Sequence, residues 1–482
     1  MNVALCIAWL LPLVAGVSLW LALNPVRRAG WLAAACGHGL VFGLLLAAAA
    51  TAVFARADTA HAWLHAAPPL GILAAIAAVV AWWRMRGRAS LPCTKVEKSP
   101  KWIIGLLALA MASLVWRGWL ALREILLRPT FPWDAWDAWA VKSKTWFLLG
   151  HYAPFVSMHD WLAQPTRELY TSIAWAYPAT LAWMQVWFAS AAGGWIEPQV
   201  NLPWFALGIG LLVAHYGQWR ALGLDRTRAL AAMYALGSLP LLDVHVALAG
   251  YADLWLATVL GFAVLAWLRW QRERDRGQAI VFVVCALLLP AIKLEGAIWL
   301  LLLAAMAGYA ALPVRWRRAA LAAAAAVLTL ALLLPHWRLP VPGLGWVDAT
   351  RAAITVSAVG TYQLQFHADA LTSWVNSLLV QPNWHLLWWL APVIAVWRWR
   401  ELRAQADLRH LGAFVLLGFG FLLFLFVYTD AARWAESYTA INRLILHIVP
   451  ATVTLLALLC RDAARTELPD TTPSPAALSD PA

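Results

Sequence analysis

The segment VALCIAWLLPLVAGVSLWLAL, at residues 3–23, contains 21 residues and no charged side chain. An α-helix of this length rises about 30 Å, which is the thickness of the hydrocarbon core of a bilayer. The segment therefore predicts a membrane-spanning helix. Arg27 and Arg28 follow it and no basic residue precedes it, so we expect a retained first span that enters from the outer side of the membrane.

Similar apolar runs continue along the whole chain. Hydrophobic residues make up 63% of the 482 residues and charged residues only 12%, whereas about a quarter of the residues in soluble proteins are charged. The runs also lack the strict alternation of barrel strands. The sequence thus predicts an all-α, polytopic transmembrane helical bundle. Its apolar runs lie at 3–23, 30–54, 68–83, 102–121, 172–190, 202–219, 229–247, 254–270, 278–291, 296–312, 319–335, 384–397, 410–428 and 442–460.

Basic residues set the expected orientation. The net charge of +12 is concentrated in short loops within 84–101, 269–276, 315–318 and 398–409, which is the pattern of cytoplasmic loops. Because this basicity marks orientation and contact with membrane lipid, we expect no nucleic-acid partner. The pattern favours about 13 spans with the C-terminus inside, provided that one segment between 172 and 250 does not cross.

The remaining polar segments then lie outside, where we expect them to carry short interfacial helices. The expected outer loops are 122–171, 336–383 and 429–441. The chain divides into an N-terminal addition of three spans with a basic cytoplasmic loop, a catalytic transmembrane module and a disordered tail, at 1–101, 102–460 and 461–482.

The most unusual polar residues follow a long apolar run, in the stretch PWDAWDAWAVKSKTW at 132–146. A membrane protein places such a mixture at the water interface, where Asp134 and Asp137 are positioned to act on a substrate. The two aspartates are three residues apart and share one face of a helix, so a merely amphipathic interfacial helix is the alternative. The neighbouring rings either stack on a sugar or anchor the helix in the interface; they belong to Trp133, Trp136 and Trp139.

Several motifs follow one another in a characteristic order. After the D-x-x-D pair come Gly150 and Tyr177-Pro178, then GYADL at 250–254, KLEG at 293–296 and NRLILHIVP at 442–450. In this order the chain resembles the C-type glycosyltransferase superfamily, and in particular the bacterial protein O-mannosyltransferase and aminoarabinose transferase group. It departs from that group because three spans precede the acidic loop.

The resemblance implies transfer of a sugar from a polyprenyl-phosphate donor to a glycan, lipid or protein of the cell envelope. The reaction would take place on the outer face of the bacterial cytoplasmic membrane and invert the anomeric centre. Asp134 or Asp137 would take the proton of the acceptor hydroxyl. Fixed charges would hold the substrate and stabilise the departing phosphate; the candidates are Lys142, Lys144, Asp253, Lys293, Glu295, His336, Arg338, Arg433, Arg443 and His447.

Several of these residues also have structural explanations. Lys293 and Glu295 would form an ion pair in a helix break, Asp253 would sit at a helix N-terminus favoured by the dipole, and Arg443 would extend to the interface. The histidines of the outer loops, together with acids, could form a divalent metal site, but none shows tight ligand spacing, and we assign no cofactor.

A transporter or flippase for a lipid-linked glycan is the alternative function. It would use the same tryptophans and cations to bind without reacting. It predicts internal repeats and ionisable residues at the membrane midplane, and the sequence shows neither clearly.

Overall fold

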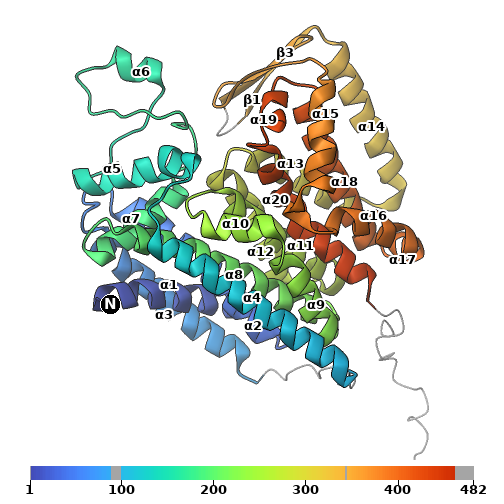
Figure 1. Cartoon of the computed structure of the whole chain (residues 1–482), viewed down its shortest axis with the longest axis horizontal. Coiled ribbons are helices and arrows are strands. Elements are labelled where there is room, and N and C mark those ends of the chain that lie inside the picture. The colour runs from blue at the N-terminus through green and yellow to red at the C-terminus, as the bar shows by residue number, and fades with distance from the viewer. Residues whose placement is uncertain (1, 88–98, 342–344, 462–482) are drawn as a thin grey trace, which may run out of the picture.

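The computed structural model describes residues 2–87, 99–341 and 345–461, and most of them are helical (Figure 1). In chain order the helices are α1 (Val3–Leu23), α2 (Trp31–Phe54), α3 (Ala62–Met85), α4 (Lys101–Leu127), η1 (Ala135–Ala140), α5 (Val141–Leu149), α6 (Met158–Ala163), α7 (Thr180–Ala192), α8 (Glu197–Ala221), α9 (Arg226–Gly237), α10 (Pro240–Ala247), α11 (Asp253–Glu273), α12 (Arg276–Ile292), α13 (Gly296–Ala311), α14 (Val314–Leu333), α15 (Ala368–Val375), η2 (Asn376–Val380), η3 (Pro382–Trp384), α16 (Leu387–Trp397), α17 (Trp399–Ala404), α18 (Ala406–Val427), α19 (Ala432–Glu436) and α20 (Ile441–Leu459).

Nine helices within the described residues are long and apolar enough to cross a membrane, or ten if α9 and α10 form one broken span. The chain is therefore a multi-pass membrane protein. This number is lower than the predicted number of about 13 spans. Several of the apolar runs form helices that are too short to cross the membrane in one straight segment. The run at 172–190 contains only the 13-residue helix α7, which rises about 20 Å.

The region between 172 and 250, where one segment was expected not to cross the membrane, is irregular at two places. Residues 172–179 form turns, and α9 and α10 meet at an angle of 63° across a short break. Two segments of this region, rather than one, are thus not simple straight spans.

Helix α11 lies at the centre of the molecule, with α8, α12 and α20 packed around it. Almost all of its side chains are buried, because nearly every position is apolar or small. A helix that is hydrophobic on all sides is stable only when other helices surround it. Its N-terminus carries the buried carboxylate of Asp253, around which the candidate site is built.

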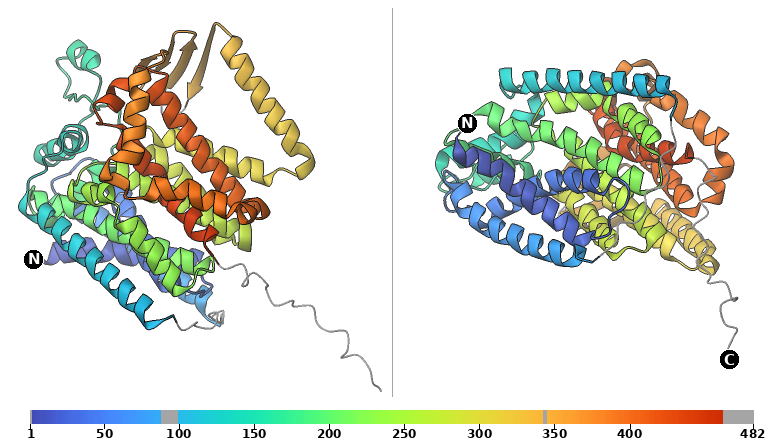
Figure 2. Two further views of the ribbon diagram at one scale, coloured as in Figure 1. Left: turned by 45° about the vertical axis from the view of Figure 1, so that its right-hand side comes forward. Right: turned by 90° about the horizontal axis from the view of Figure 1, so that it is seen from below.

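The three N-terminal helices share one core with the rest of the chain (Figure 2). The indole Nε1 of Trp187 in α7 donates to the carbonyl of Ala8 in α1 at 3.0 Å. The boundary at residue 101 between the N-terminal addition and the catalytic module therefore remains a prediction from the sequence. The packing of the helices does not separate the two parts. Nearly all of the predicted tail at 461–482 lies outside the described residues.

An antiparallel sheet corrects the all-α prediction. Its strands β1 (His336–Val341), β2 (Gly345–Thr350), β3 (Ala353–Val356) and β4 (Gly360–Gln363) pair in sequence order. β-Branched residues are concentrated in β3, which contains Ile354, Thr355 and Val356, and Gly345 and Gly360 provide positive φ angles of 75° and 140°. The expected interfacial helices occur only in the second half of this loop, as α15 and η2.

The loop at 122–171 does contain short helices, namely η1, α5 and α6. In Figure 1 its helix α6 and the sheet strand β3 lie at the same end of the molecule. The two long polar loops are thus on one side of the bundle.

Helices α2 and α8 touch through glycine. A Cβ added to Gly217 would lie 2.2 Å from the backbone nitrogen of Ala34 and 2.7 Å from the carbonyl oxygen of Gly30. Small residues at such positions allow two membrane helices to pack backbone against backbone.

We expect Gly217→Ala to destabilise the folded protein by about 1–3 kcal/mol, because the added methyl group forces the two backbones apart. Thermal unfolding in detergent measures the change. Gly308→Ala is the matched control, because Gly308 lies in α13 with no atom within 4 Å of an added Cβ. Equal unfolding temperatures for the two variants would contradict the close packing of α2 on α8.

Candidate functional site

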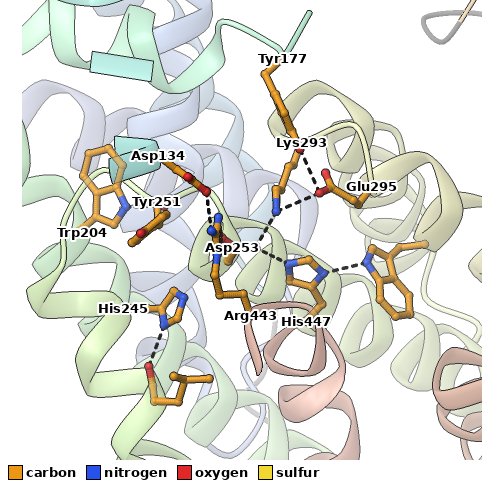
Figure 3. Close-up of polar contacts among 12 residues, drawn as sticks. Asp134, Tyr177, Trp204, His245, Tyr251, Asp253, Lys293, Glu295, Arg443 and His447 are labelled. Carbon is orange, nitrogen blue, oxygen red and sulfur yellow. Dashed lines mark hydrogen bonds and ion pairs between the residues drawn. The ribbon is translucent and has the colours of Figure 1, made fainter. Parts of the chain in front are cut away.

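The site is centred on Asp253, whose side chain is fully buried at the start of α11 (Figure 3). Its Oδ1 accepts hydrogen bonds from Nζ of Lys293 at 2.8 Å and from Nε2 of His447 at 3.0 Å. Its Oδ2 accepts two from Arg443, from Nε at 3.0 Å and Nη2 at 2.8 Å. A helix N-terminus favours a carboxylate, but four donors from three side chains exceed what a helix-terminal acid requires.

Arg443 connects two carboxylates from distant parts of the sequence. Besides the paired bonds to Asp253, its Nη1 donates to Oδ2 of Asp134. The guanidinium also lies over the ring of Tyr251, 4.3 Å from the ring centroid. With a side chain only 16% exposed, Arg443 does not extend to the interface but points into the bundle.

Lys293 and Glu295 lie in the break between α12 and α13. Nζ of Lys293 is 3.0 Å from Oε1 of Glu295, which also accepts a hydrogen bond from the hydroxyl of Tyr177 at 3.1 Å. Oε2 of Glu295 is buried and has no hydrogen-bond partner among the described residues. The break thus places the ammonium group of Lys293 beside Asp253, and Oε2 of Glu295 is left without a donor in the described structure.

The hydrogen bonds of His447 fix its tautomer. Nε1 of Trp299 donates to Nδ1 of His447 at 3.1 Å. An indole nitrogen is only a donor, so Nδ1 carries no proton and Nε2 donates to Asp253. His447 is therefore a neutral donor that orients Asp253, and in this arrangement it is not one of the cations predicted for phosphate.

The cluster carries more negative than positive charge. Asp134, Asp253 and Glu295 contribute three negative charges, while Lys293 and Arg443 contribute two positive ones, which leaves a net charge of −1. Both cations are thus already paired. An incoming anion therefore competes with a carboxylate for one of them, and Asp134, with a side chain 39% exposed, is the most accessible of the three.

Asp134 is held near Arg443 by the chain around it. The Thr130 amide donates to Oε2 of Glu197 at 2.6 Å, which ties the approach to η1 to the start of α8. Gly250 has a φ of 110°, and a Cβ there would lie only 2.4 Å from Cβ of Ala135. The turn before α11 and the first turn of η1 therefore pack closely because residue 250 is a glycine.

The second predicted aspartate, Asp137, lies in the π-helical turn η1. It has no hydrogen-bond or ion-pair partner among the described residues. Partial burial and the negative charge of Asp134 raise the pKa of Asp137. Of the two carboxylates, Asp134 is therefore engaged and Asp137 is free.

The three predicted sugar-stacking tryptophans differ in exposure. Trp133 and Trp136 are 62% and 42% exposed and meet edge to face, with ring centroids 5.1 Å apart. Trp139 is buried against Tyr177, with ring centroids 5.4 Å apart. The first two rings offer a surface to a ligand, whereas Trp139 supports the loop that carries Tyr177.

The two predicted lysines of α5, Lys142 and Lys144, differ in burial. Lys142 is buried, and its Nζ donates to the carbonyls of Ala174, Trp175 and Tyr177 at 3.0, 3.0 and 2.7 Å. Burial lowers the pKa of Lys142 to about 8, so that it remains mainly charged at neutral pH. All three donors of its ammonium are used by the loop, whereas Lys144 is exposed.

The remaining predicted residues are not joined to the cluster by a hydrogen bond or ion pair in the described structure. Nε2 of His336 lies 2.9 Å from Oδ1 of Asp348 on the neighbouring strand. Arg338 lies over the ring of Trp346 at 4.3 Å, and Arg433 over its neighbour Trp434 at 4.7 Å.

Tyr362 of β4 lies within the electrostatic influence of both Glu295 and Arg433. Burial and the charge of Glu295 raise the pKa of Tyr362 in β4 to about 12, and the charge of Arg433 opposes this rise. Arg433 and Glu295 thus act on the same phenol.

Tyr177, Tyr251 and Trp299 were not predicted as site residues. The first two belong to motifs already named, Tyr177-Pro178 and GYADL, so membership of a motif was a usable signal. Trp299 lies in an apolar run that gives no such signal. Among the described residues, no group of three or more His, Cys, Asp or Glu side chains is placed to hold a metal ion.

The sequence matches no family model, and neither a curated protein nor a solved structure matches it significantly. The resemblance to C-type glycosyltransferases therefore remains a prediction that rests on the motifs themselves.

Replacement of Lys142 by methionine should lower the free energy of unfolding by about 3 kcal/mol, because three partly buried carbonyls lose their donor. Thermal or denaturant unfolding in detergent measures it. Lys144→Met, two residues further along α5 and exposed, should have little effect. A similar loss in both variants would show that Lys142 has no special role in the loop.

Proposed function

We propose that this protein is a membrane glycosyltransferase that moves a sugar from a polyprenyl-phosphate donor to a cell-envelope acceptor. The observation that supports this most is the bridge from Asp134 through Arg443 to the buried Asp253. It places a carboxylate able to take a proton next to a cation able to hold a phosphate. These are the two groups that glycosyl transfer from a lipid phosphate requires.

The convergence of the motifs also supports the proposal. Asp134, Asp253, Lys293 and Arg443 come from four separated segments of the chain, and an accidental match of short motifs does not require them to meet. In a membrane protein, ionisable residues kept inside the bundle are functional candidates because burying them is costly.

The proposed reaction is a single displacement at the anomeric carbon. The acceptor oxygen attacks the face opposite the phosphate, and a new carbon–oxygen bond forms there. The bond between the anomeric carbon and the phosphate oxygen breaks, and its electron pair stays on the phosphate. The acceptor proton goes to Asp134 or Asp137, while Arg443 and Lys293 stabilise the departing phosphate.

Binding of the sugar donor would also change the contacts of Asp134, because Asp134 is paired with Arg443 when no substrate is bound. Arg443 already uses Nε and Nη2 on Asp253, so the phosphate would compete with Asp134 for Nη1. A displaced Asp134 carboxylate regains a free lone pair facing the substrate. Donor binding would thereby release a carboxylate for proton transfer at the moment when it is needed.

The position of the site relative to the membrane is part of the same proposal. The basic loops mark the cytoplasmic side, which puts η1, the sheet and the Asp253 end of α11 on the periplasmic side of the inner membrane, in a bundle of about 13 spans. Trp133 and Trp136 then face the interface, where a sugar attached to a membrane-bound lipid would stack. The polyprenyl chain would enter from the side, because it is too apolar to leave the bilayer.

Transfer and donor binding should respond differently to changes in the bridge. We expect Arg443→Gln to lose both donor binding and transfer. We expect Asp134→Asn to lose about 10²-fold or more in transfer, yet to bind the donor as tightly as wild type or more tightly, because the competitor for Arg443 is gone. A radiolabelled polyprenyl-phosphate sugar measures both quantities on purified protein.

Asp160→Asn is the matched control, since Asp160 is an exposed carboxylate in the same loop that contacts only its neighbours Ser157 and His159. It should retain full activity. Full transfer in both Asp134→Asn and Asp137→Asn would exclude the assigned base. Saturable donor binding without transfer in the wild type would instead indicate a carrier of the lipid-linked glycan.

The pH dependence of transfer distinguishes the two aspartates. A base acts only when ionised, so if Asp137 is the base, activity should fall on acidification at a pH above the usual carboxylate pKa of about 3.9. Asp134→Asn removes a charge that raises the pKa of Asp137. The acid limb of the residual activity should then move to lower pH. Loss of the acid limb in this variant would instead identify Asp134 as the titrating base of the wild type, and an unchanged limb would exclude both aspartates.

A further inference from the structure

A second charged cavity lies at the other end of α11. It has a volume of about 300 Å³ and is formed by the end of α11, the junction of α13 with α14 and the start of α18. Helix α11 contains 21 residues, so this cavity is about 30 Å from Asp253 along the helix axis. It is therefore separate from the site described above.

Cations predominate in the lining of this cavity. Arg272, Arg274 and Arg317 line it, and Asp407 is the one carboxylate among its described lining residues. Asp407 is already bound by Arg272, with 2.6 Å between Oδ2 and Nε. The lining thus carries two positive charges in excess, the opposite sign to the cluster around Asp253.

Arg274 is the least satisfied of the three arginines. Its guanidinium has no hydrogen-bond or ion-pair partner among the described residues, although two acids flank it in sequence. Glu273 is engaged by Arg269 at 2.8 Å and by Arg28 at 3.2 Å. Asp275 accepts the amide of Gly277 at 2.8 Å as the cap of α12. Neither acid forms an ion pair with Arg274 in the described structure.

The backbone at Arg274 is also unusual. It ends α11 with a φ of 54°, in the left-handed region where glycine is favoured. An arginine in this conformation is rare, and the conformation directs a long cationic side chain to the cavity that it lines. Residues held in such conformations concentrate at functional sites.

His410 of α18 is the one aromatic side chain among the described lining residues of the cavity. His410 is flanked edge-on by Trp267 and Tyr309, with ring centroids 6.0 and 5.7 Å away. Arg317 donates Nε and Nη2 to the carbonyls of Leu312 and Ala310 and lies over the ring of Tyr309. No side chain of α14 in the described structure is buried, so its apolar surface is open to acyl chains.

We propose that this cavity binds the phosphate group of an anionic lipid of the cytoplasmic leaflet. Its arginines come from loops whose basic residues mark the cytoplasmic side, at the depth of the lipid headgroups. Basic pockets between helices at this depth are typical sites for anionic headgroups. The planar fork of arginine matches phosphate oxygens, and 300 Å³ is at the small end of the range of ligand cavities.

Lipid binding to the full-length protein in phosphatidylcholine nanodiscs tests the proposal, with phosphatidylglycerol as the added probe. Native mass spectrometry or a fluorescent lipid gives the affinity. We expect Arg274→Gly and Arg317→Gln each to weaken phosphatidylglycerol binding about fivefold, which corresponds to the loss of one cation close to an anionic lipid. Arg315→Gln should leave it unchanged, because Arg315 lies on the same helix outside the cavity and over Trp316.

Arg274→Gly also separates binding from folding. Glycine suits the left-handed conformation, so this variant should unfold at the same temperature as wild type or higher while it loses lipid affinity. Equal affinities in all variants would overturn the proposal, as would equal binding of phosphatidylcholine. Displacement of the lipid by millimolar inorganic phosphate would assign the cavity to a soluble phosphate instead.

Discussion

The hydrogen-bonded charge of Asp253 is the constraint on which the arrangement of this protein depends. A carboxylate with no exposed surface, at the end of the most buried helix, is very costly unless cations and donors surround it. Lys293, Arg443 and His447 satisfy both of its oxygens. Lys293 comes from the α12–α13 break, and Arg443 and His447 come from α20. The buried charge of Asp253 therefore fixes the positions of these two elements relative to α11.

This requirement explains irregular features that would otherwise appear as defects in the helices. The chain between α12 and α13 is broken at Lys293, which places an ammonium beside Asp253 instead of continuing an apolar span. Gly250 lets the turn before α11 approach Ala135, and η1 departs from α-helical geometry immediately after Asp134. Breaks and π-helical turns in helices are common at functional sites, because they change the direction of a side chain that a regular helix would place elsewhere.

Much of this protein follows from its sequence, but the parts do so for different reasons. The helical bundle could be predicted because apolar runs without charges have few alternatives in a membrane. Asp134, Asp253, Lys293 and Arg443 could be predicted because charge within or beside such runs is conspicuous. What the residues do to one another could not be predicted, since the neutral tautomer of His447 depends on Trp299, which is one apolar residue among many.

The features that the sequence does not reveal have equally specific causes. The prediction of Lys142 as a phosphate ligand rests on its charge, which is visible in the sequence, whereas the three carbonyls that its ammonium contacts belong to a loop more than thirty residues away. The sheet was missed because its strands are short and the first of them contains proline and basic residues and follows an apolar helix. The run at 172–190 was counted as long enough to cross because hydropathy does not distinguish a buried helix of 13 residues from part of a span.

The pairing of every cation in the resting cluster has a physical reason of its own. Two unpaired cations inside a membrane bundle would be costly whenever no anionic substrate is bound. Asp134 is partly exposed and lies at the start of a short irregular turn, so in the proposed function it would hold Arg443 in the absence of substrate and be displaced at little cost. Asp253 is buried at the start of a long helix, where its hydrogen bonds orient Arg443 and Lys293. In the proposed function one acid would thus hold the cations permanently and the other would hold Arg443 until an anionic substrate binds.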